Sequence, residues 1–588
     1  MFQSRTHTCG ELRLGNAGEW ATIVGWMENV REVGSTLAFV VVRDFYGTTQ
    51  VVIENNEELM ALVKGLNCES TISVTGMVRE RSNKNEKLPT GEIELVPEGI
   101  EVLGRCIYNE LPFEINRSRE ASEEARLRYR YLDLRNPAVK EKIVLRSRVV
   151  AELRRSMTEH GFLEITTPIL TCSSPEGARD YLVPSRIHPG KFYALPQAPQ
   201  QFKQLLMTSG FDRYFQIAPC FRDEDARADR SPGEFYQLDM EMAFASQEDV
   251  FAVLEDVLPP IFAKFGKYSR ASSAPFTRIT YNDAMEKYGS DKPDLRISLV
   301  VDDVTDLVSG CGFAAFEGNV VKAVVAPAFD KPRKAIDKIV TDVESATEQK
   351  CYWFKVNPDS TLAGGIAKFL AERAEEVKRA LNLSGGECVF LCAGKKAVAQ
   401  KTAGVIRKIL GNSVENYMDR EQYLFCWIVD FPMYEIGEES GALEFCHNPF
   451  SMPQGGLEAL EQKDPLEIMA FQYDLVCNGV ELSSGAVRNH DPEIMIKAFE
   501  LVGLGEENVK AKFPAMYNAF CYGAPPHAGI APGVDRMVML IAGEESIREI
   551  IPFPMNKNAQ DLMMGAPSEV EKKQLDDVHI AIVREEKK

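Results

Sequence analysis

The chain has 588 residues, of which 45% are hydrophobic and 26% are charged, and its formal net charge is −20. This balance is typical of a soluble multidomain protein, and the acidic excess excludes a protein that coats nucleic acid nonspecifically, although it permits a local basic surface. No run of about 18 apolar residues and no signal-peptide hydrophobic region occurs, so we expect a cytoplasmic protein without a membrane contact.

The cysteines indicate reduced, buried thiols. There are 13 of them, scattered through the chain without a Cys-x-x-Cys pair. Disulfides and a cysteine-based zinc site are therefore not expected.

Residues 1–105 have the pattern of an all-β domain. Strands are predicted at 21–27, 36–43, 48–53, 71–79 and 92–96, with a helix at 56–66. Five strands with one helix between the third and the fourth is the order of an OB-fold barrel, which often binds oligonucleotides through aromatic and basic side chains. The candidates for such contacts are Arg31, Phe39, Gln50, Arg79 and Arg81. The alternative that Phe39 is core and the arginines only solvate the surface stays open.

The next segments lead into a second domain. Residues 106–140 are polar and charge-dense and are interpreted as a hinge. A helix is predicted from about 137 to 160, followed by a strand over 162–168 that ends in a proline, as at a sheet edge or an interface. The Gly- and Pro-bearing segment 174–185 is a plausible mobile lid, and the helix after it places Gln200 and Lys203 one turn apart on one face.

The stretch 213–242 organises the rest of the chain. Two strands are predicted at 213–224 and 234–242, joined by the polar loop 225–233. Alternation places Gln237, Asp239 and Glu241 on one face, and Arg222 and Glu224 likewise share a face. One guanidinium among several carboxylates suits recognition of a small zwitterion beside a phosphate. A solvated face of a hairpin is the alternative.

The composition and the predicted secondary structure change between about residues 290 and 418. Lys- and Glu-rich helical stretches alternate there with short strands, which indicates an inserted α+β domain. After it, Asn478-Gly479 between two apolar runs predicts a tight hairpin, in which Asp474 lies diagonally across from Glu481. Two carboxylates placed in this way favour Mg²⁺ that holds phosphates, and two exposed strand carboxylates are the alternative.

A turn rich in small residues precedes the last predicted helix of this region. The segment 523–533 is followed by a helix with Arg536 in its first turn. A helix N-terminus preceded by glycines attracts phosphate, although this glycine spacing alone is a weak signal.

Together these stretches resemble the three signature motifs of class II aminoacyl-tRNA synthetases. Motif 1 is the helix and strand that close with Pro168, motif 2 is Phe221-Arg-x-Glu224, and motif 3 is Gly529-x-x-x-Gly533-x-x-Arg536. Over about residues 5–570 the chain resembles the bacterial-type aspartyl enzymes of subclass IIb, through the stretches 176–186, 221–225 and 525–529 and through the insertion.

The resemblance implies a multidomain α+β fold with an N-terminal OB-fold β-barrel, an antiparallel-sheet catalytic domain and an inserted GAD-type α+β domain. The implied division is an anticodon-binding barrel, a hinge, the first part of the catalytic domain, the insertion, the second part of the catalytic domain and a C-terminal extension, at 1–105, 106–140, 141–289, 290–418, 419–565 and 566–588. A homodimer is also implied, because motif 1 usually builds a two-fold dimer.

The implied reaction has two steps. Aspartate and ATP give aspartyl-adenylate and pyrophosphate, and the terminal ribose of tRNA-Asp then takes the aspartyl group. The implied catalytic residues are Arg222, at the α-phosphate and the substrate carboxylate, Glu224 near ATP, and Arg536 at the γ-phosphate. Asp223, Gly533, Val534 and Asp535 are further implied ATP contacts, and Asp474 and Glu481 would hold Mg²⁺.

The resemblance also implies an aspartate pocket. Arg488 would pair with the substrate side-chain carboxylate in a bidentate manner, Lys203 would add a second cation, and Glu176 would close over the ammonium group. Asp239 and Gln200 would orient the pocket, and His447 is carried over as a further contact. Two cations disfavour asparagine, because a neutral amide would leave them unpaired.

Three positions depart from the family pattern. The second histidine of a common His-His-Pro is Asn448, a frequent serine is Ala198, and Gly233 lengthens the motif 2 loop near Ser231. None removes a charged group that the chemistry needs.

Several alternatives stay open. An asparaginyl or lysyl enzyme of the same class would share the barrel and the motifs, and an inactive RNA-binding paralogue would keep the fold. Some bacterial aspartyl enzymes also charge tRNA-Asn, through barrel loops near Val33-Gly34 and 82–84. The variants at 447–456 and 481–488 resemble a subset that includes many such enzymes, so we expect charging of both tRNAs.

Overall fold

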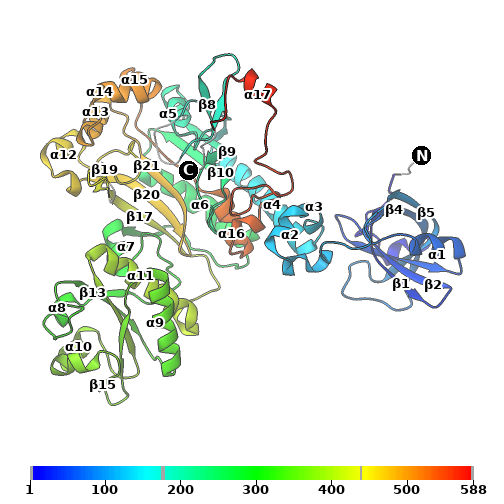
Figure 1. Ribbon diagram of the computed structural model, residues 1–588, viewed down its shortest axis with the longest axis horizontal. Helices are drawn as coiled ribbons and strands as arrows, with labels where there is room; N and C mark the ends of the chain where they lie inside the picture. Colours follow the sequence, from blue (N-terminus) through cyan, green and yellow to red (C-terminus); the bar gives the residue numbers. More distant parts are fainter. Residues whose placement is uncertain (1–3, 174–178, 438–439, 584–588) are drawn as a thin grey trace. The chain divides into compact units, whose positions relative to one another are not determined.

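The computed structural model describes residues 4–173, 179–437 and 440–583, and the chain divides into two compact units, Met1–Glu114 and Ile115–Lys588 (Figure 1). Among the described residues, no helix is long and apolar enough to cross a membrane. All 13 cysteines are described, and each is a free thiol. Seven are buried, but Cys68, Cys172 and Cys521 are exposed, so the prediction of buried thiols is wrong for these three.

The first unit is a five-stranded closed barrel with the strand order β1-β2-β3-β5-β4. Its elements are η1 (Leu14–Asn16), β1 (Trp20–Val33), β2 (Leu37–Arg43), β3 (Thr48–Glu54), α1 (Glu57–Lys64), β4 (Thr71–Glu80) and β5 (Ile93–Gly104). The inward residues of the strands, such as Ile23, Val40 and Ile72, are fully buried. Helix α1 starts where the Asn56 side chain accepts a hydrogen bond from the Leu59 backbone N–H. The predicted OB-fold is confirmed.

The second unit is built on an eight-stranded sheet with the order β11-β17-β20-β21-β22-β10-β9-β6, which is antiparallel except for its two edge pairs. Its strands are β6 (Leu163–Glu164), β9 (Arg213–Arg222), β10 (Gly233–Ala243), β11 (Thr277–Thr280), β17 (Phe425–Pro432), β20 (Met469–Cys477), β21 (Val480–Val487) and β22 (His527–Ile530). A single core buries one face of this sheet against helices α4 (Pro137–Glu159), α6 (Gln247–Phe265) and α16 (Val534–Ala542).

Strand β6 is much shorter than the strand predicted over 162–168. It pairs with β9 only at Leu163 and Glu164. Beyond it, the Thr167 backbone N–H donates to the side-chain oxygen of Gln216 instead of to a strand carbonyl. A hydrogen bond to a side chain thus replaces backbone pairing between strands before Pro168, and the strand ends earlier than predicted.

Both predicted hairpins form, and the second has the expected pairing beside its turn, but a register shift between Leu475 and Val476 places Asp474 opposite Ser484. Strands β9 and β10 pair from Gly233–Arg222 to Met242–Arg213. In β20 and β21, Val476 pairs with Glu481, and the turn residues Asn478 and Gly479 have φ values of 52° and 79°. Positive φ at both turn residues is the geometry that an Asn-Gly pair favours in a two-residue hairpin.

A separate five-stranded sheet lies within residues 290–418. Its order is β12-β13-β16-β14-β15, and helices α9 and α11 pack against it. The elements are β12 (Val301–Asp303), α8 (Thr305–Val308), β13 (Val320–Ala326), α9 (Arg333–Thr347), β14 (Tyr352–Val356), β15 (Leu362–Ala363), η3 (Ala367–Arg373), α10 (Ala374–Ala380), β16 (Cys388–Gly394) and α11 (Lys396–Ser413). A separate sheet with helices packed on it is the arrangement expected of an inserted α+β domain.

Shorter elements complete the second unit. They are η2 (Ile115–Glu120), α2 (Glu123–Arg128), α3 (Arg130–Asp133), β7 (Leu182–Pro184), β8 (Phe192–Ala194), α5 (Gln200–Thr208), α7 (Tyr281–Tyr288), η4 (Glu415–Tyr417), β18 (Tyr434–Ile436), β19 (Leu443–Phe445), α12 (Gly456–Gln462), η5 (Pro465–Glu467), α13 (Pro492–Leu501), α14 (Glu506–Lys512), α15 (Pro514–Cys521), η6 (Ile547–Glu549) and α17 (Lys572–Asp577).

Candidate active site

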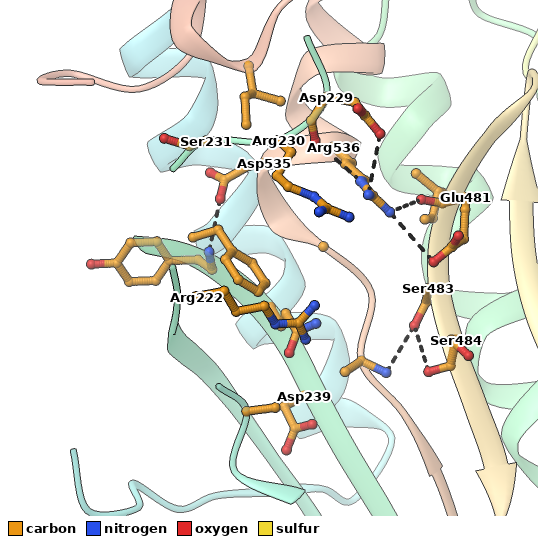
Figure 2. Close-up of a pocket in the computed structure, with 18 of the residues that line it drawn as sticks. Arg222, Asp229, Arg230, Ser231, Asp239, Glu481, Ser483, Ser484, Asp535 and Arg536 are labelled. Atoms are coloured by element: carbon orange, nitrogen blue, oxygen red, sulfur yellow. Dashed lines mark hydrogen bonds and ion pairs between the residues drawn. The ribbon is translucent and has the colours of Figure 1, made fainter. Parts of the chain in front are cut away.

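A cavity of about 340 Å³ opens on the polar face of the eight-stranded sheet (Figure 2). Strands β9, β10 and β21 form its floor, and helix α5 and the start of α16 form its walls. The predicted site residues that line it are Gln200, Lys203, Arg222, Glu224, Asp239, Glu481, Arg488, Gly533, Asp535 and Arg536. These residues come from four stretches far apart in the sequence, and the fold brings them together.

One end of the cavity is a buried charge network. The Lys203 ammonium lies 2.7 Å from Asp239 and 3.2 Å from Glu241. Glu241 in turn accepts two hydrogen bonds from the Arg488 guanidinium, at 2.8 and 3.1 Å. None of the four side chains is more than 2% exposed. Two cations and two carboxylates are therefore held away from water, each paired with a neighbour.

Strand β10 explains how this network forms. Leu238, Met240 and Met242 point into the hydrophobic core, so Asp239 and Glu241 face the opposite side. The next strand, β22, comes so close that a Cβ on Gly529 would lie 1.9 Å from a Glu241 oxygen. Only glycine fits there, which gives the first glycine of the predicted third motif a steric reason.

The network sets the ionisation of its carboxylates. Burial would raise the pKa of Glu241, but Arg488 and Lys203 hold it at about 2. Burial raises the pKa of Asp239, and Lys203 opposes this shift. Glu241 is thus a fixed anion that belongs to the protein and neutralises part of the positive charge of the pocket.

Four buried polar atoms on the cavity wall have no hydrogen-bond partner among the described residues. They are Arg488 Nη1, Gln200 Nε2, Arg222 Nε and Asp239 Oδ2. Three of them donate hydrogen bonds and one is a carboxylate oxygen that accepts them. Because leaving such groups unpaired costs about 1–3 kcal/mol each, the set indicates a ligand with both anionic acceptors and a donor.

The Arg488 guanidinium, which was predicted to bind the substrate, is shared between the protein and the cavity. The Nε and Nη2 groups of Arg488 are both used by Glu241. Nη1 has no hydrogen-bond partner among the described residues. Because a guanidinium carries five N–H donors and Glu241 uses two of them, Nη1 and the second hydrogen of Nη2 can still bind a substrate carboxylate while Glu241 stays in place.

The other end of the cavity is more open and rich in arginine. The Arg222 guanidinium lies 5.0 Å from the centre of the Phe235 ring, and Arg230 pairs with Glu224 at 2.6 Å. Arg536 donates to the Glu481 backbone carbonyl at 2.7 Å and lies 3.3 Å from the Asp229 carboxylate, as Figure 2 shows. Three guanidiniums on one wall suit a polyphosphate.

The residues after Gly533 have different tasks. The Val534 side chain is fully buried in the core. Asp535 is engaged by Arg146 and accepts a hydrogen bond from the Tyr236 backbone N–H at 2.9 Å. Of the implied ATP contacts in this turn, Asp535 lines the cavity but is bound to the protein, and Val534 does not line it.

The predicted carboxylate pair forms. Asp474 is buried behind Glu481, and burial and the Glu481 charge raise the pKa of Asp474. Glu481 is 24% exposed and lies 2.8 Å from the Lys292 ammonium. Among the described residues, no group of three or more His, Cys, Asp or Glu is placed so that it could hold a metal ion by itself. Two carboxylates facing a phosphate site fit Mg²⁺, which usually takes one or two carboxylates together with substrate phosphates.

The remaining predicted ligand contacts lie at or beyond the edge of the cavity. Glu176 lies outside the described residues. The Asp223 backbone N–H donates to the Arg179 carbonyl, and neither Asp223 nor the exposed His447 lines the cavity. His447 packs edge-on against Phe431, and its neighbour Asn448 lines the cavity instead.

The candidate nucleic-acid contacts of the barrel form two groups. The Arg31 guanidinium lies 5.0 Å from the centre of the half-buried Phe39 ring. Gln50 donates to Glu94 and accepts from Arg81, both at 3.0 Å, and Arg79 also bonds Glu94. Phe39 is therefore partly accessible and not core.

Several cavity residues were not predicted from the sequence, among them Arg230, Phe235 and Lys292. The pairing of Glu241 with Arg488 behind the cavity was not predicted either. Strand alternation already placed Glu241 on the correct face, but neither pattern nor spacing could show that Lys292 reaches Glu481 across about 190 residues.

Comparisons with known proteins agree with this architecture. The family model described as tRNA synthetases class II (D, K and N) matches residues 122–557, and the model for the OB-fold nucleic acid binding domain matches residues 21–103. A relative from Acidiphilium cryptum, named aspartate–tRNA(Asp/Asn) ligase, is 54% identical over 99% of this chain and 98% of its own. A relative from Streptomyces coelicolor, named aspartate–tRNA ligase, is 52% identical over 99% of both chains.

Solved structures share the fold. Asparaginyl-tRNA synthetase from Pyrococcus horikoshii, complexed with asparaginyl-adenylate, matches with a TM-score of 0.57 at 18% identity, over 93% of this chain and 97% of its own. Aspartyl-tRNA synthetase from Entamoeba histolytica matches with a TM-score of 0.56 at 20% identity, over 92% and 89%.

Proposed function

The chain belongs to the class II tRNA synthetases of the aspartyl, lysyl and asparaginyl group, and from this premise we propose that it is an aspartate–tRNA ligase. It activates L-aspartate with ATP and transfers the aspartyl group to the 3′ end of tRNA-Asp and, in our proposal, also of tRNA-Asn. The observation that supports aspartate best is the set of unpaired polar atoms on the cavity wall.

Aspartate complements this set group by group. Its side-chain carboxylate accepts from Arg488 Nη1 and the Lys203 ammonium, and its ammonium group donates to Asp239 Oδ2. Asparagine presents a neutral amide to the same cations and leaves their charge unmatched. The side chains of the site are buried and are already held in place by Glu241 and Asp239. The unmatched charge therefore lowers the affinity for asparagine without relief from water or from rearrangement.

Activation is an in-line displacement at phosphorus. The α-carboxylate of aspartate attacks the α-phosphorus of ATP, the bond to the bridging oxygen breaks, and pyrophosphate leaves. Arg222, between the buried network and the open end, neutralises charge on the α-phosphate, and Arg536 and Arg230 bind the departing pyrophosphate. Phe235 offers an aromatic face to the adenine. A terminal ribose hydroxyl of the tRNA then attacks the aspartyl carbonyl, and AMP leaves.

Asp474 and Glu481 are the residues that would hold Mg²⁺, which supplies charge neutralisation to the phosphates when it is bound with ATP. Glu481 faces the cavity and would be the direct ligand. Asp474, buried behind it, would add the second negative charge.

Partner binding is proposed on separate grounds. The barrel would bind the anticodon through Phe39, Arg31, Gln50, Arg79 and Arg81. A homodimer is supported by apolar side chains left in solvent where motif 1 ends, since Leu163, Ile169 and Leu170 are each about half exposed. Light scattering during size-exclusion chromatography tests the dimer. A monomer at micromolar concentration would contradict it.

The experiment that tests the function is aminoacylation of two separate transcripts by the purified protein. We expect aspartate to be attached to tRNA-Asp and to tRNA-Asn at comparable rates. Charging of tRNA-Asp alone would retain the ligase but contradict the wider tRNA range, and would establish the discriminating enzyme. Charging of neither, with an active control enzyme, would contradict the proposed function.

A further inference from the structure

The inserted region sends a loop into the cavity. Helix α7 ends at Gly289, and the following residues 290–300 lead to strand β12. Lys292 lines the cavity, and its ammonium lies 2.8 Å from the Glu481 carboxylate. The ATP half of the cavity is therefore not built from the motif strands alone.

The structure fixes this loop at both of its ends. Ser290 accepts a hydrogen bond from the Lys292 backbone N–H through its hydroxyl, and Arg296 pairs with Asp294 at 2.7 Å. From helix α11, the buried Arg407 donates to the carbonyls of Asp294, Ile297 and Leu299. Helix α11 of the five-stranded sheet region thus holds residues 294–299 of the loop.

The loop also packs against the β20–β21 hairpin, which carries Asp474 and Glu481. Gly479 in the β20–β21 turn comes so close to it that an added Cβ would lie 3.1 Å from the Asp294 Cβ. The hairpin that carries Asp474 and Glu481 and the loop that carries Lys292 are thus packed together. The Lys292–Glu481 contact is a consequence of this packing and not of two free side chains that meet by chance.

We propose that Lys292 is a built-in counter-ion that occupies the metal-facing carboxylate of Glu481 until a divalent cation arrives with ATP. This inference rests on the proposed function. The Lys292 ammonium, 2.8 Å from a Glu481 oxygen, neutralises the carboxylate charge and repels a divalent cation that approaches it. Lys292 and the cation compete for one site, and the phosphates of ATP offer the displaced ammonium a new partner.

A consequence is that the free enzyme binds divalent cations weakly. Lys292 already neutralises the Glu481 carboxylate without metal, so a cation that binds there must displace the ammonium. Lys292 is a positioning residue in this account, because it acts through Glu481. It ties occupancy of the metal site to the arrival of the nucleotide.

The test is binding of Mn²⁺ to the full-length enzyme without ATP, measured by electron paramagnetic resonance. Removal of one positive charge next to a divalent site strengthens Mn²⁺ binding by about tenfold in Lys292→Met. Lys292→Arg should stay within about twofold of the wild type. The added affinity should be lost again in the double variant Lys292→Met/Glu481→Gln, which shows that the ion sits on Glu481.

A matched control is Lys287→Met, which removes an exposed lysine of helix α7 that pairs with Asp283 at 3.2 Å. It should leave Mn²⁺ binding unchanged. If Lys292→Met, and equally Lys292→Gln, bind Mn²⁺ no more tightly than the wild type, the counter-ion proposal is wrong and Lys292 only fastens the inserted region. The titration needs neither aspartate nor tRNA, so a failure of the aspartate–tRNA ligase proposal would appear separately, as absence of aminoacylation in the wild type.

Discussion

The two ends of the cavity are built on opposite principles. At the amino-acid end, Lys203, Asp239, Glu241 and Arg488 are at most 2% exposed and already paired with one another. At the nucleotide end, Arg230, Glu224, Glu481 and Arg536 are 23–31% exposed, and their ion-pair partners also face solvent. Selection between aspartate and asparagine needs a dry, rigid site, whereas a polyphosphate must enter with its cation and leave as pyrophosphate.

The comparison predicts that damage at the amino-acid end is the more severe. Arg488→Leu removes the donor that points at the substrate and leaves buried Glu241 with Lys203 alone. We expect aspartate-dependent ATP–pyrophosphate exchange to fall by about 10³-fold or more, while ATP binding survives. Calorimetry with ATP and circular dichroism would establish that the variant is folded. Normal exchange in this variant would refute the pocket assignment.

Lys203→Met tests the second cation of the same end. The variant keeps the length and the apolar stem of the side chain but frees Asp239 and Glu241 of their shared ammonium. We expect the preference for aspartate over asparagine in kcat/KM to fall by about 10²-fold. An unchanged preference would mean that Arg488 alone reads the substrate charge.

At the open end a single change should have a milder effect. Arg536→Gln removes one of three guanidiniums, and Arg230 and Arg222 remain to bind phosphate. We expect the KM for ATP to rise by about 30-fold, with a smaller change in the KM for aspartate. Arg270→Gln, which removes an exposed arginine paired with Asp419, is the matched control. A larger effect on aspartate than on ATP would reverse the assignment of the two ends.

The smallest effect is expected from the barrel. Phe39→Ala removes a partly accessible ring that Arg31 covers from one side. Loss of one stacked base costs about 1–3 kcal/mol, so we expect the KM for tRNA to rise by about tenfold, with aspartate activation unchanged. Loss of activation as well would indicate that Phe39 supports folding of the barrel and does not contact RNA.

The sequence predicted the fold well wherever local pattern and long-range structure agree. The barrel order, the β9–β10 hairpin and the Asn478–Gly479 turn follow from alternation and turn chemistry, which are local properties. The strand over 162–168 was predicted too long, because the side chain of Gln216, some 50 residues away, takes over the backbone bond of Thr167.

The site was predictable in its residue types but not in its pairings. Resemblance supplied Lys203, Asp239 and Arg488, and the structure brings them into one cavity. That Glu241 occupies two of the Arg488 donors, and that Lys292 lies on Glu481, depends on contacts between distant segments. A single sequence carries no signal for such contacts.

The central claim is that the buried charge network selects aspartate. The most direct measurement is ATP–pyrophosphate exchange by the purified wild-type protein, with aspartate and asparagine in parallel and without tRNA. We predict exchange with aspartate and a kcat/KM for asparagine that is lower by about 10³-fold or more. Exchange with asparagine at a comparable efficiency would contradict the account, because the cations of the pocket would then not distinguish a carboxylate from a neutral amide.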